Sequence, residues 1–238
     1  MSSKNHFRLA SYNVRKCVGL DRRRRPGRIV DVLNSLDADV IALQEADRRL
    51  GDRPAALPAN LIEAHTDFQF VTLPGNGASV GWHGNAVLVK SGLEILRSIP
   101  LDLPGTEPRG ALSVELSNGF RLVATHLGLL RRDRRRQMAR ICEIFGDDCM
   151  ATAIIGDFNE WSESRGLEPL AKNFELLSPG NSFHSARPVA ALDRIATNSL
   201  LQITGAGVTE TKLSKIASDH LPIWADIKLN RSNTAPLA

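Results

Sequence analysis

The feature that most constrains this chain is a series of short apolar runs with β-strand composition, separated by runs with helical periodicity. This alternation is typical of an α/β protein, in which helices cover a sheet. The first predicted strand spans residues 7–14. A second strand, Val40-Ile41-Ala42-Leu43, is almost wholly apolar and suits burial on both faces. Further strands are predicted at residues 86–90, 112–116, 121–125, 152–155, 193–197 and 221–229.

Two helices are predicted between these strands. The first begins at Pro26, whose fixed φ and missing N–H suit the first turn of a helix. The second spans residues 131–145. Its buried side is predicted to consist of Met138, Ile141, Cys142 and Phe145. Proline and glycine cluster at residues 74–84 and 100–110, where we expect loops.

The chain has no internal repeat, and neither loop cluster separates halves of different composition. We therefore expect one domain over residues 1–229, followed by a frayed polar tail at residues 230–238. Hydrophobic residues make up 42% of the 238 residues and charged residues 24%, which excludes a wholly disordered chain.

The expected compartment is the cytoplasm. No apolar stretch approaches the ~20 residues that cross a bilayer, and no signal-peptide apolar region follows Met1. Cys17, Cys142 and Cys149 form no even disulfide framework and no C-x-x-C pair, so we expect them to be reduced.

The formal net charge of +4 is modest, but the arginines are unevenly distributed. Arg22 to Arg25 form one run, and residues 131–136 contain five arginines. Because arginine binds phosphate bidentately, nucleic acid, an anionic lipid headgroup and a small phosphoester are candidate partners. A solvated basic surface is the alternative. No aromatic residue lies among these arginines, so the sequence predicts no platform for stacking bases.

Polar side chains stand where several predicted strands begin or end. Open α/β sheets collect their chemistry at such strand ends. Taken singly, each residue is more often a turn former or a helix cap. The residues are Asn13, Glu45, Asp157, Asn159, Asp219 and His220.

These residues belong to four of six motifs that resemble, in order, those of the endonuclease/exonuclease/phosphatase (DNase I-like) superfamily. That superfamily includes nucleases, deadenylases, inositol-polyphosphate phosphatases and neutral sphingomyelinases, all of which cleave phosphoester bonds. The motifs are Ser11-Tyr12-Asn13-Val14, Leu43-Gln44-Glu45, Thr125-His126-Leu127, Gly156-Asp157-Phe158-Asn159, Leu192-Asp193-Arg194-Ile195 and Ser218-Asp219-His220. Gly84-Asn85-Ala86-Val87-Leu88 and Arg109-Gly110-Ala111-Leu112 look like a small bacterial branch of the superfamily.

The resemblance runs from about Leu9 to Leu229. It implies a two-sheet α/β sandwich flanked by helices, with an active cleft at one end, and a metal-dependent hydrolase of phosphoric esters. The implied cofactor is Mg²⁺, with Mn²⁺ as the alternative. Glu45 is the implied principal ligand, assisted by Asn13 and by Asp219, directly or through water. These residues offer the hard oxygen donors that Mg²⁺ prefers.

The resemblance also implies catalytic roles. Asp157 would be the general base that activates water, and Asn159 would hold that water or a phosphate oxygen. His220 would donate a hydrogen bond to the phosphate, with Asp193 fixing its tautomer. His126 would make a second phosphate contact.

Asn85, Arg109 and Arg15 are further candidates for binding phosphate. Abasic-site endonucleases of this superfamily carry an aspartate at the position of Arg15, whereas the DNase I-like branch carries arginine there. A cation cannot ligate a metal, so Arg15 argues against abasic-site repair and favours one principal metal ion.

Together these expectations predict a Mg²⁺-dependent phosphodiesterase. Nuclease-like activity is favoured because the arginines of residues 131–136 follow closely after His126. A phospholipid or small-molecule phosphodiesterase or phosphatase is the alternative. A non-catalytic module that binds nucleic acid or lipid is a third reading. The presence of Glu45, Asp157 and His220 favours an enzyme over this third reading.

Overall fold

The structure is a computed structural model that describes residues 5–48, 53–73, 77–162 and 165–230. Its strands form two mixed sheets of six strands each. In spatial order, the first sheet consists of β11 (Leu201–Val208), β12 (Ile223–Leu229), β1 (His6–Asn13), β2 (Val40–Gln44), β4 (Ala86–Lys90) and β3 (Phe68–Phe70). The second consists of β5 (Ile95–Leu103), β6 (Arg109–Leu116), β7 (Phe120–His126), β8 (Ala151–Asp157), β10 (Asp193–Thr197) and β9 (Glu175–Leu177).

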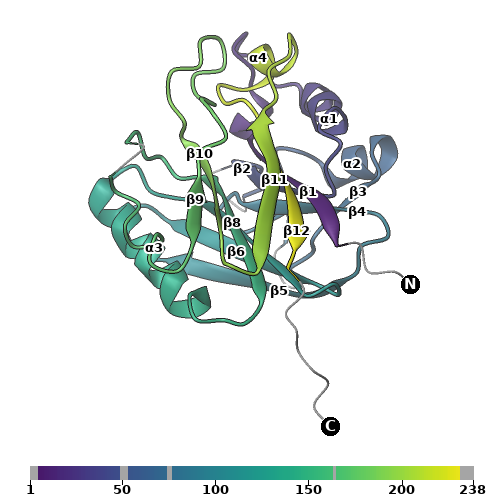
Figure 1. The fold of residues 1–238 in the computed structure, drawn as a ribbon. Helices are drawn as coiled ribbons and strands as arrows, with labels where there is room; N and C mark the ends of the chain where they lie inside the picture. The colour runs from purple at the N-terminus through teal and green to yellow at the C-terminus, as the bar shows by residue number, and fades with distance from the viewer. Residues whose placement is uncertain (1–4, 49–52, 74–76, 163–164, 231–238) are drawn as a thin grey trace.

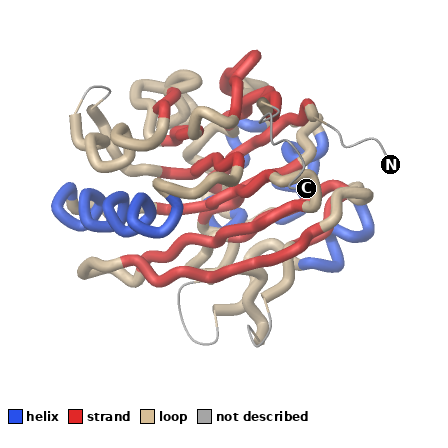
Figure 2. The backbone as a smooth tube through the Cα atoms, turned by 60° about the horizontal axis from the view of Figure 1, so that its bottom comes forward, coloured by secondary structure: helices blue, strands red, loops and turns tan. Residues whose placement is uncertain are grey.

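The sheets pack face to face, and helices cover their outer faces. The helices are α1 (Pro26–Asn34), α2 (Ala59–His65), α3 (Arg131–Phe145) and α4 (Ser214–Ala217), with a 3₁₀ turn at Arg15–Cys17. Figures 1 and 2 show α3 on one flank and α1 and α2 on the opposite flank. The predicted two-sheet α/β sandwich flanked by helices is therefore confirmed.

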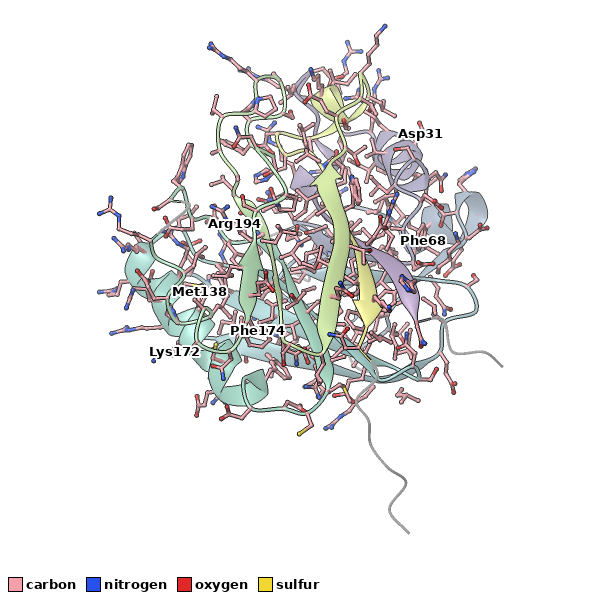
Figure 3. The ribbon with its side chains drawn as sticks, in the orientation of Figure 1. Asp31, Phe68, Met138, Lys172, Phe174 and Arg194 are labelled. Carbon is pink, nitrogen blue, oxygen red and sulfur yellow. The ribbon has the colours of Figure 1, made fainter. Side chains whose placement is uncertain are left out.

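Three apolar clusters correspond to these layers. The cluster between the sheets includes Leu9 and Val87 from the first sheet and Leu112 and Ile155 from the second. A second cluster joins α1 and α2 to the first sheet. A third joins α3 to the second sheet and includes Met138 and Phe174, labelled in Figure 3. The residues of β2 alternate between the first two clusters, which confirms that this strand is buried on both faces.

Each sheet contains one parallel pair of strands, and the polar residues stand at the carboxyl ends of these pairs. In the first sheet β1 runs parallel to β2, with Asn13 beside Gln44. In the second, β7 runs parallel to β8, with His126 beside Asp157. The segments around α4 and between β9 and β10 gather at one end of the molecule (Figure 1). This arrangement brings the strand ends of both sheets to a common site.

The predicted loop at residues 100–110 is wrong in part, because β5 continues to Leu103 and β6 begins at Arg109. Pro100 is tolerated because β5 is an edge strand, where a missing N–H breaks no pairing in the interior of the sheet. Cys142, predicted to be buried, is half-buried and contacts the Pro169 carbonyl through its thiol at 3.1 Å.

Several expectations concern residues outside the described ranges. Residues 74–76 of the other predicted loop and 231–238 of the predicted tail are among them. Within the described ranges, no helix has the length and apolar composition needed to span a membrane.

Gly156 permits the close approach of β7 and β8. Its φ is +151°, and a Cβ there would lie 1.8 Å from the carbonyl oxygen of Thr125, a backbone atom that cannot turn aside. We expect Gly156→Ala to lower the free energy of unfolding by more than about 2 kcal/mol, since it combines overpacking with backbone strain. Chemical denaturation measures this. As a control, Gly27→Ala in α1 meets no atom within 4 Å and should be neutral or slightly stabilising. Equal stability of both variants and the wild type would contradict this reading.

Candidate active site

Asp157 lies at the centre of the candidate site. It ends β8, and only 1% of its surface is exposed. One carboxylate oxygen accepts a hydrogen bond from the side-chain amide of Asn13 at 3.0 Å. The other accepts the backbone N–H of Asn159 at 2.9 Å. Because Asn13 belongs to the first sheet and Asp157 to the second, this site exists only where the two sheets meet.

Two histidines flank the Asp157 carboxylate. The Nε2 atoms of His126 and His220 lie 3.4 and 3.6 Å from the same oxygen. On its other side, His220 Nδ1 lies 2.8 Å from Asp193, which also accepts a hydrogen bond from the Ser182 hydroxyl at 2.5 Å. Asp193 therefore orients the imidazole so that Nε2 faces Asp157.

The charges of this group are set by burial and by one another. Burial raises the pKa of Asp157 to about 6, although the positive charge of His220 opposes the shift. Burial alone would lower the pKa of His220, but the carboxylates of Asp193 and Asp157 raise it to about 10. Near neutral pH the group therefore contains a carboxylate that can accept a proton and an imidazolium that can stabilise a negatively charged oxygen.

The predicted metal ligands also lie at this end of the first sheet. Asn13 ends β1, and Glu45 directly follows β2. The Glu45 carboxylate contacts the Lys16 ammonium, and Asp219 lies 3.1 Å from the Arg15 guanidinium. Two carboxylates that each attract a cation, together with an amide oxygen, form a set of hard oxygen donors. This set fits a divalent cation such as Mg²⁺.

Asp157, Asp193 and His220 form a second group with ligand chemistry, since their ligand atoms lie within 4.8 Å of one another. The hydrogen bond between His220 and Asp193 already uses Nδ1, and the raised pKa of His220 keeps the ring protonated near neutral pH. A protonated imidazole cannot ligate a metal. Proton chemistry therefore suits this group better than metal binding.

The backbone around the candidate metal ligands adopts an unusual conformation. Arg15, Lys16 and Cys17 have φ values of 46°, 54° and 61°, and Glu45 has 54°. Such left-handed conformations cost a non-glycine residue about 1–3 kcal/mol each. Hydrogen bonds support the turn, including one from Lys16 N–H to the Glu45 carbonyl at 3.0 Å. Strain of this kind concentrates at functional sites, which agrees with the placement of the predicted ligands here.

Two buried arginines fix the segment that follows Asp157. Arg134 of α3 pairs with Glu160 at 2.8 Å and donates to the Leu129 carbonyl at 2.6 Å. Arg194, labelled in Figure 3, donates from β10 to the Glu160 carbonyl at 3.3 Å. Arg134 belongs to the arginine run that was predicted as a phosphate-binding candidate, but its buried contacts give it a structural role. The beginning of α3 consequently lies beside the Asp157 segment.

The other predicted phosphate-binding residues differ in placement. Arg109 is 6% exposed, and its guanidinium lies 2.9 Å from Glu107. It lines a pocket together with Glu45 and His126. Asn85 is buried and donates to the carbonyls of Trp82 and Gly110, so its amide N–H groups fix the backbone around it. The side chain of Asn159 donates to the Leu127 carbonyl at 2.8 Å.

An aromatic pair beside His220 was not predicted. The Phe183 ring lies 5.0 Å from His220, and the Trp161 ring lies 5.9 Å from Phe183. Trp161 is 62% exposed. The prediction of no stacking platform rested on the arginine runs, which contain no aromatic residue, and it did not anticipate this exposed ring. Trp161 and Phe183 lie 22 residues apart in sequence and outside the arginine runs, so the sequence gives no sign that they meet beside His220.

The comparison with known families agrees with this geometry. The model of the Endonuclease/Exonuclease/phosphatase family matches residues 10–220, which include every polar group of the site. The chain belongs to the endonuclease/exonuclease/phosphatase family. Its recognition from the six motifs is thus confirmed.

Several known proteins are similar to nearly the whole chain at low sequence identity. The uncharacterized protein YbhP of Escherichia coli K12 is 24% identical, and the alignment covers 94% of this chain and 96% of YbhP. A family member from Beutenbergia cavernae superposes with a TM-score of 0.73 at 22% identity, over 98% of this chain and 74% of that one. TDP2 of D. rerio, solved with a single-strand DNA product, superposes with a TM-score of 0.70 at 16% identity. The superposition covers 94% of this chain and 100% of that one.

Proposed function

We propose that this protein is a metal-dependent phosphodiesterase of the endonuclease/exonuclease/phosphatase family. The observation that carries the proposal is the buried group in which Asp157 meets Asn13 and both histidines while Asp193 holds His220. This group requires the ends of both sheets, which also supports one catalytic domain over residues 1–229.

Each group of the chain has a proposed part in the reaction. Asp157 accepts the proton of the attacking water, and Asn159 helps to hold that water. His220, oriented by Asp193, donates a hydrogen bond to a non-bridging phosphate oxygen, and His126 makes a second phosphate contact. Glu45, Asn13 and Asp219 would hold Mg²⁺ or Mn²⁺. When bound, the metal supplies positive charge that stabilises the developing charge on the phosphoryl oxygens.

The proposed substrate class is a nucleic acid. TDP2 of D. rerio, which shares this fold, was solved with a single-strand DNA product. In this chain, the exposed Trp161 offers a face on which a base can stack beside His220. The basic first turns of α3 also lie beside the Asp157 segment, where they can contact the backbone phosphates of a bound strand.

His220 and Asp193 are expected to act as one unit. His220→Ala should impair turnover, and Asp193→Asn should impair it in the same direction by freeing the imidazole tautomer. In the double variant the loss should be clearly smaller than the product of the two single losses, since Asp193 acts through the ring that is already gone. Turnover at saturating metal and substrate measures the cycle. Additive losses would show that the two residues act independently.

The arginines at the beginning of α3 test the polynucleotide assignment. Replacing Arg132, Arg135 and Arg136 with serine should raise the KM for a polynucleotide and flatten its salt dependence, by about one unit of slope for each lost phosphate contact. Turnover of a small diester should stay constant. Arg140→Ser, further along α3 and paired with Glu143, serves as the control. Unchanged polynucleotide kinetics would make these arginines a solvated surface.

The decisive experiment is a screen of the purified protein with Mg²⁺ and with Mn²⁺. Its substrates are bis-p-nitrophenyl phosphate, p-nitrophenyl phosphate, single- and double-stranded nucleic acids, and phospholipid vesicles. We expect the diester to be preferred over the monoester and nucleic acid over lipid. Absence of metal-dependent hydrolysis of every diester would refute the proposed function.

One observation favours a second candidate, a phospholipid phosphodiesterase. Large apolar side chains are exposed on segments that adjoin the site: Leu129 and Leu130 follow His126, Trp161 follows Asn159, and Ile216 precedes Asp219. Exposed apolar side chains next to arginines suit the surface of an anionic membrane. The vesicle arm of the screen separates this candidate from the first, because only a lipid substrate predicts cleavage that increases with vesicle binding.

A further inference from the structure

A pocket adjoins the candidate active site on the side of Glu45 and His126. It is a cavity of about 160 Å³, and its lining also includes Lys16, Arg53, His83 and Arg109. Pockets that enclose a whole small molecule measure roughly 300–1,000 Å³. This cavity therefore fits one chemical group of a larger substrate whose reacting phosphate lies at the neighbouring site.

The charges around the pocket favour an anion. Lys16 and Arg109 are paired with Glu45 and Glu107. Among the described residues, no carboxylate lies within ion-pair distance of Arg53, although the Asp47 carboxylate, which also lines the pocket, interacts with the guanidinium at longer range. Arg48 adds another positive charge. A phosphate group matches both the charge and the hydrogen-bonding geometry of a guanidinium.

Hydrogen bonds hold the Arg53 side chain in place. Its Nη1 lies 2.8 Å from Nδ1 of His83, and Nε2 of His83 lies 3.0 Å from Asp102. Since Arg53 can only donate, Nδ1 must accept, and the ring must then donate through Nε2 to Asp102. The Trp82 indole donates to the same Asp102 oxygen at 3.2 Å. His83 thus fixes the guanidinium without neutralising its charge.

The backbone of β6 leaves room for the rings of Trp82 and His83. A Cβ at Gly110 would lie 2.6 Å from the Trp82 ring and 2.8 Å from the His83 ring, so only glycine lets both rings pack on β6. The hydrogen-bonded chain of Asp102, His83 and Arg53 is therefore part of the folded structure, and it holds the guanidinium in place before a substrate binds. Preorganisation of this kind reduces the entropic cost of binding.

We propose that this pocket binds a second phosphate group of the substrate, with Arg53 as the binding residue and His83 as its positioning residue. The inference rests on the proposed phosphodiesterase function and adds a specificity to it. Substrates with a second phosphate near the scissile diester are bound more tightly than substrates with a single phosphate. The same phosphate chemistry occurs in a nucleotide and in a phosphorylated lipid headgroup.

The test compares dinucleotides that carry a terminal phosphate at the 5′ or 3′ end with the unphosphorylated dinucleotide. For the wild type, one of the phosphorylated forms should show a KM about 10-fold lower, because its second phosphate accepts a charge-assisted hydrogen bond from the Arg53 guanidinium. Arg53→Gln should abolish this preference while leaving kcat and the hydrolysis of bis-p-nitrophenyl phosphate unchanged. His83→Ala should reduce the preference in the same way, through KM. Arg97→Gln, at an exposed arginine of β5, is the matched control and should keep the preference.

A second measurement separates this inference from the proposed function. Calorimetric titration of the phosphorylated dinucleotide without metal should show about 10-fold weaker binding to Arg53→Gln than to the wild type, whether or not any diester is cleaved. Equal KM values for all three dinucleotides, or a preference that survives Arg53→Gln, would overturn the pocket assignment. A glycerol-based diester with a second phosphate identifies the source: if it shows the larger Arg53-dependent preference, the phosphate belongs to a lipid headgroup.

Discussion

Replacing Asp157 with asparagine is expected to lower turnover by a factor on the order of 10² or more, because the variant loses the group that accepts the proton of water. The amide retains the size of the carboxylate and an oxygen that can accept the hydrogen bond from Asn13. Folding should therefore be preserved, and circular dichroism together with the unfolding midpoint checks this. Activity is measured at saturating metal, so that weakened metal binding does not mimic a chemical defect.

Asp31→Asn is a suitable control for this variant, since Asp31 is an exposed carboxylate of α1 (Figure 3). It makes the same chemical change away from the site and should leave turnover at the wild-type value. If Asp157→Asn retained wild-type turnover at saturating metal, the general-base role would have to be abandoned.

Glu45→Gln should weaken Mg²⁺ binding by at least about 10-fold, because it removes the ligand charge while nearly preserving the shape. The substitution also deprives Lys16 of its ionic partner, so the observed loss reflects the change in charge of the whole turn. Calorimetric titration with Mg²⁺ and Mn²⁺ gives the affinity directly, and activity should recover in part at high metal concentration.

Glu63→Gln provides the matched comparison, since Glu63 is an exposed residue of α2 outside the site. Its metal affinity should equal that of the wild type. Wild-type affinity in Glu45→Gln as well would mean that the metal is held elsewhere, for example by the group of Asp157, Asp193 and His220.

The parts of the fold that could be predicted are those with strong local patterns. The apolar strand predicted at residues 40–43, which is β2 in the structure, and helix α3 were predicted from their composition and periodicity. Strands β3 and β9 have only three residues each, too few to show alternation. β11 carries a register shift between Ile203 and Gly205 and is partly exposed, which removes its regular pattern.

The same distinction applies to the site. Asn13, Asp157 and His220 could be named because each stands at the end or beginning of a strand in an ordered set of motifs. The partners that these groups meet in space could not be named. Arg53, His83 and Asp102 come from three separate segments, and only folding brings them into contact. Trp161 and Phe183 were missed for the same reason.

The pairing of β12 with β1 determines when the site can form during synthesis of the chain. The first of the described strands pairs with the last of them, from His6 beside Lys228 to Ser11 beside Ile223. Until β12 emerges, one edge of β1 lacks its partner, and such an edge can pair with another chain. Asp219 and His220 directly precede β12, so they reach Arg15 and Asp157 in the same closing step. The group of Asn13, Asp157 and His220 therefore cannot assemble before β12 is in place.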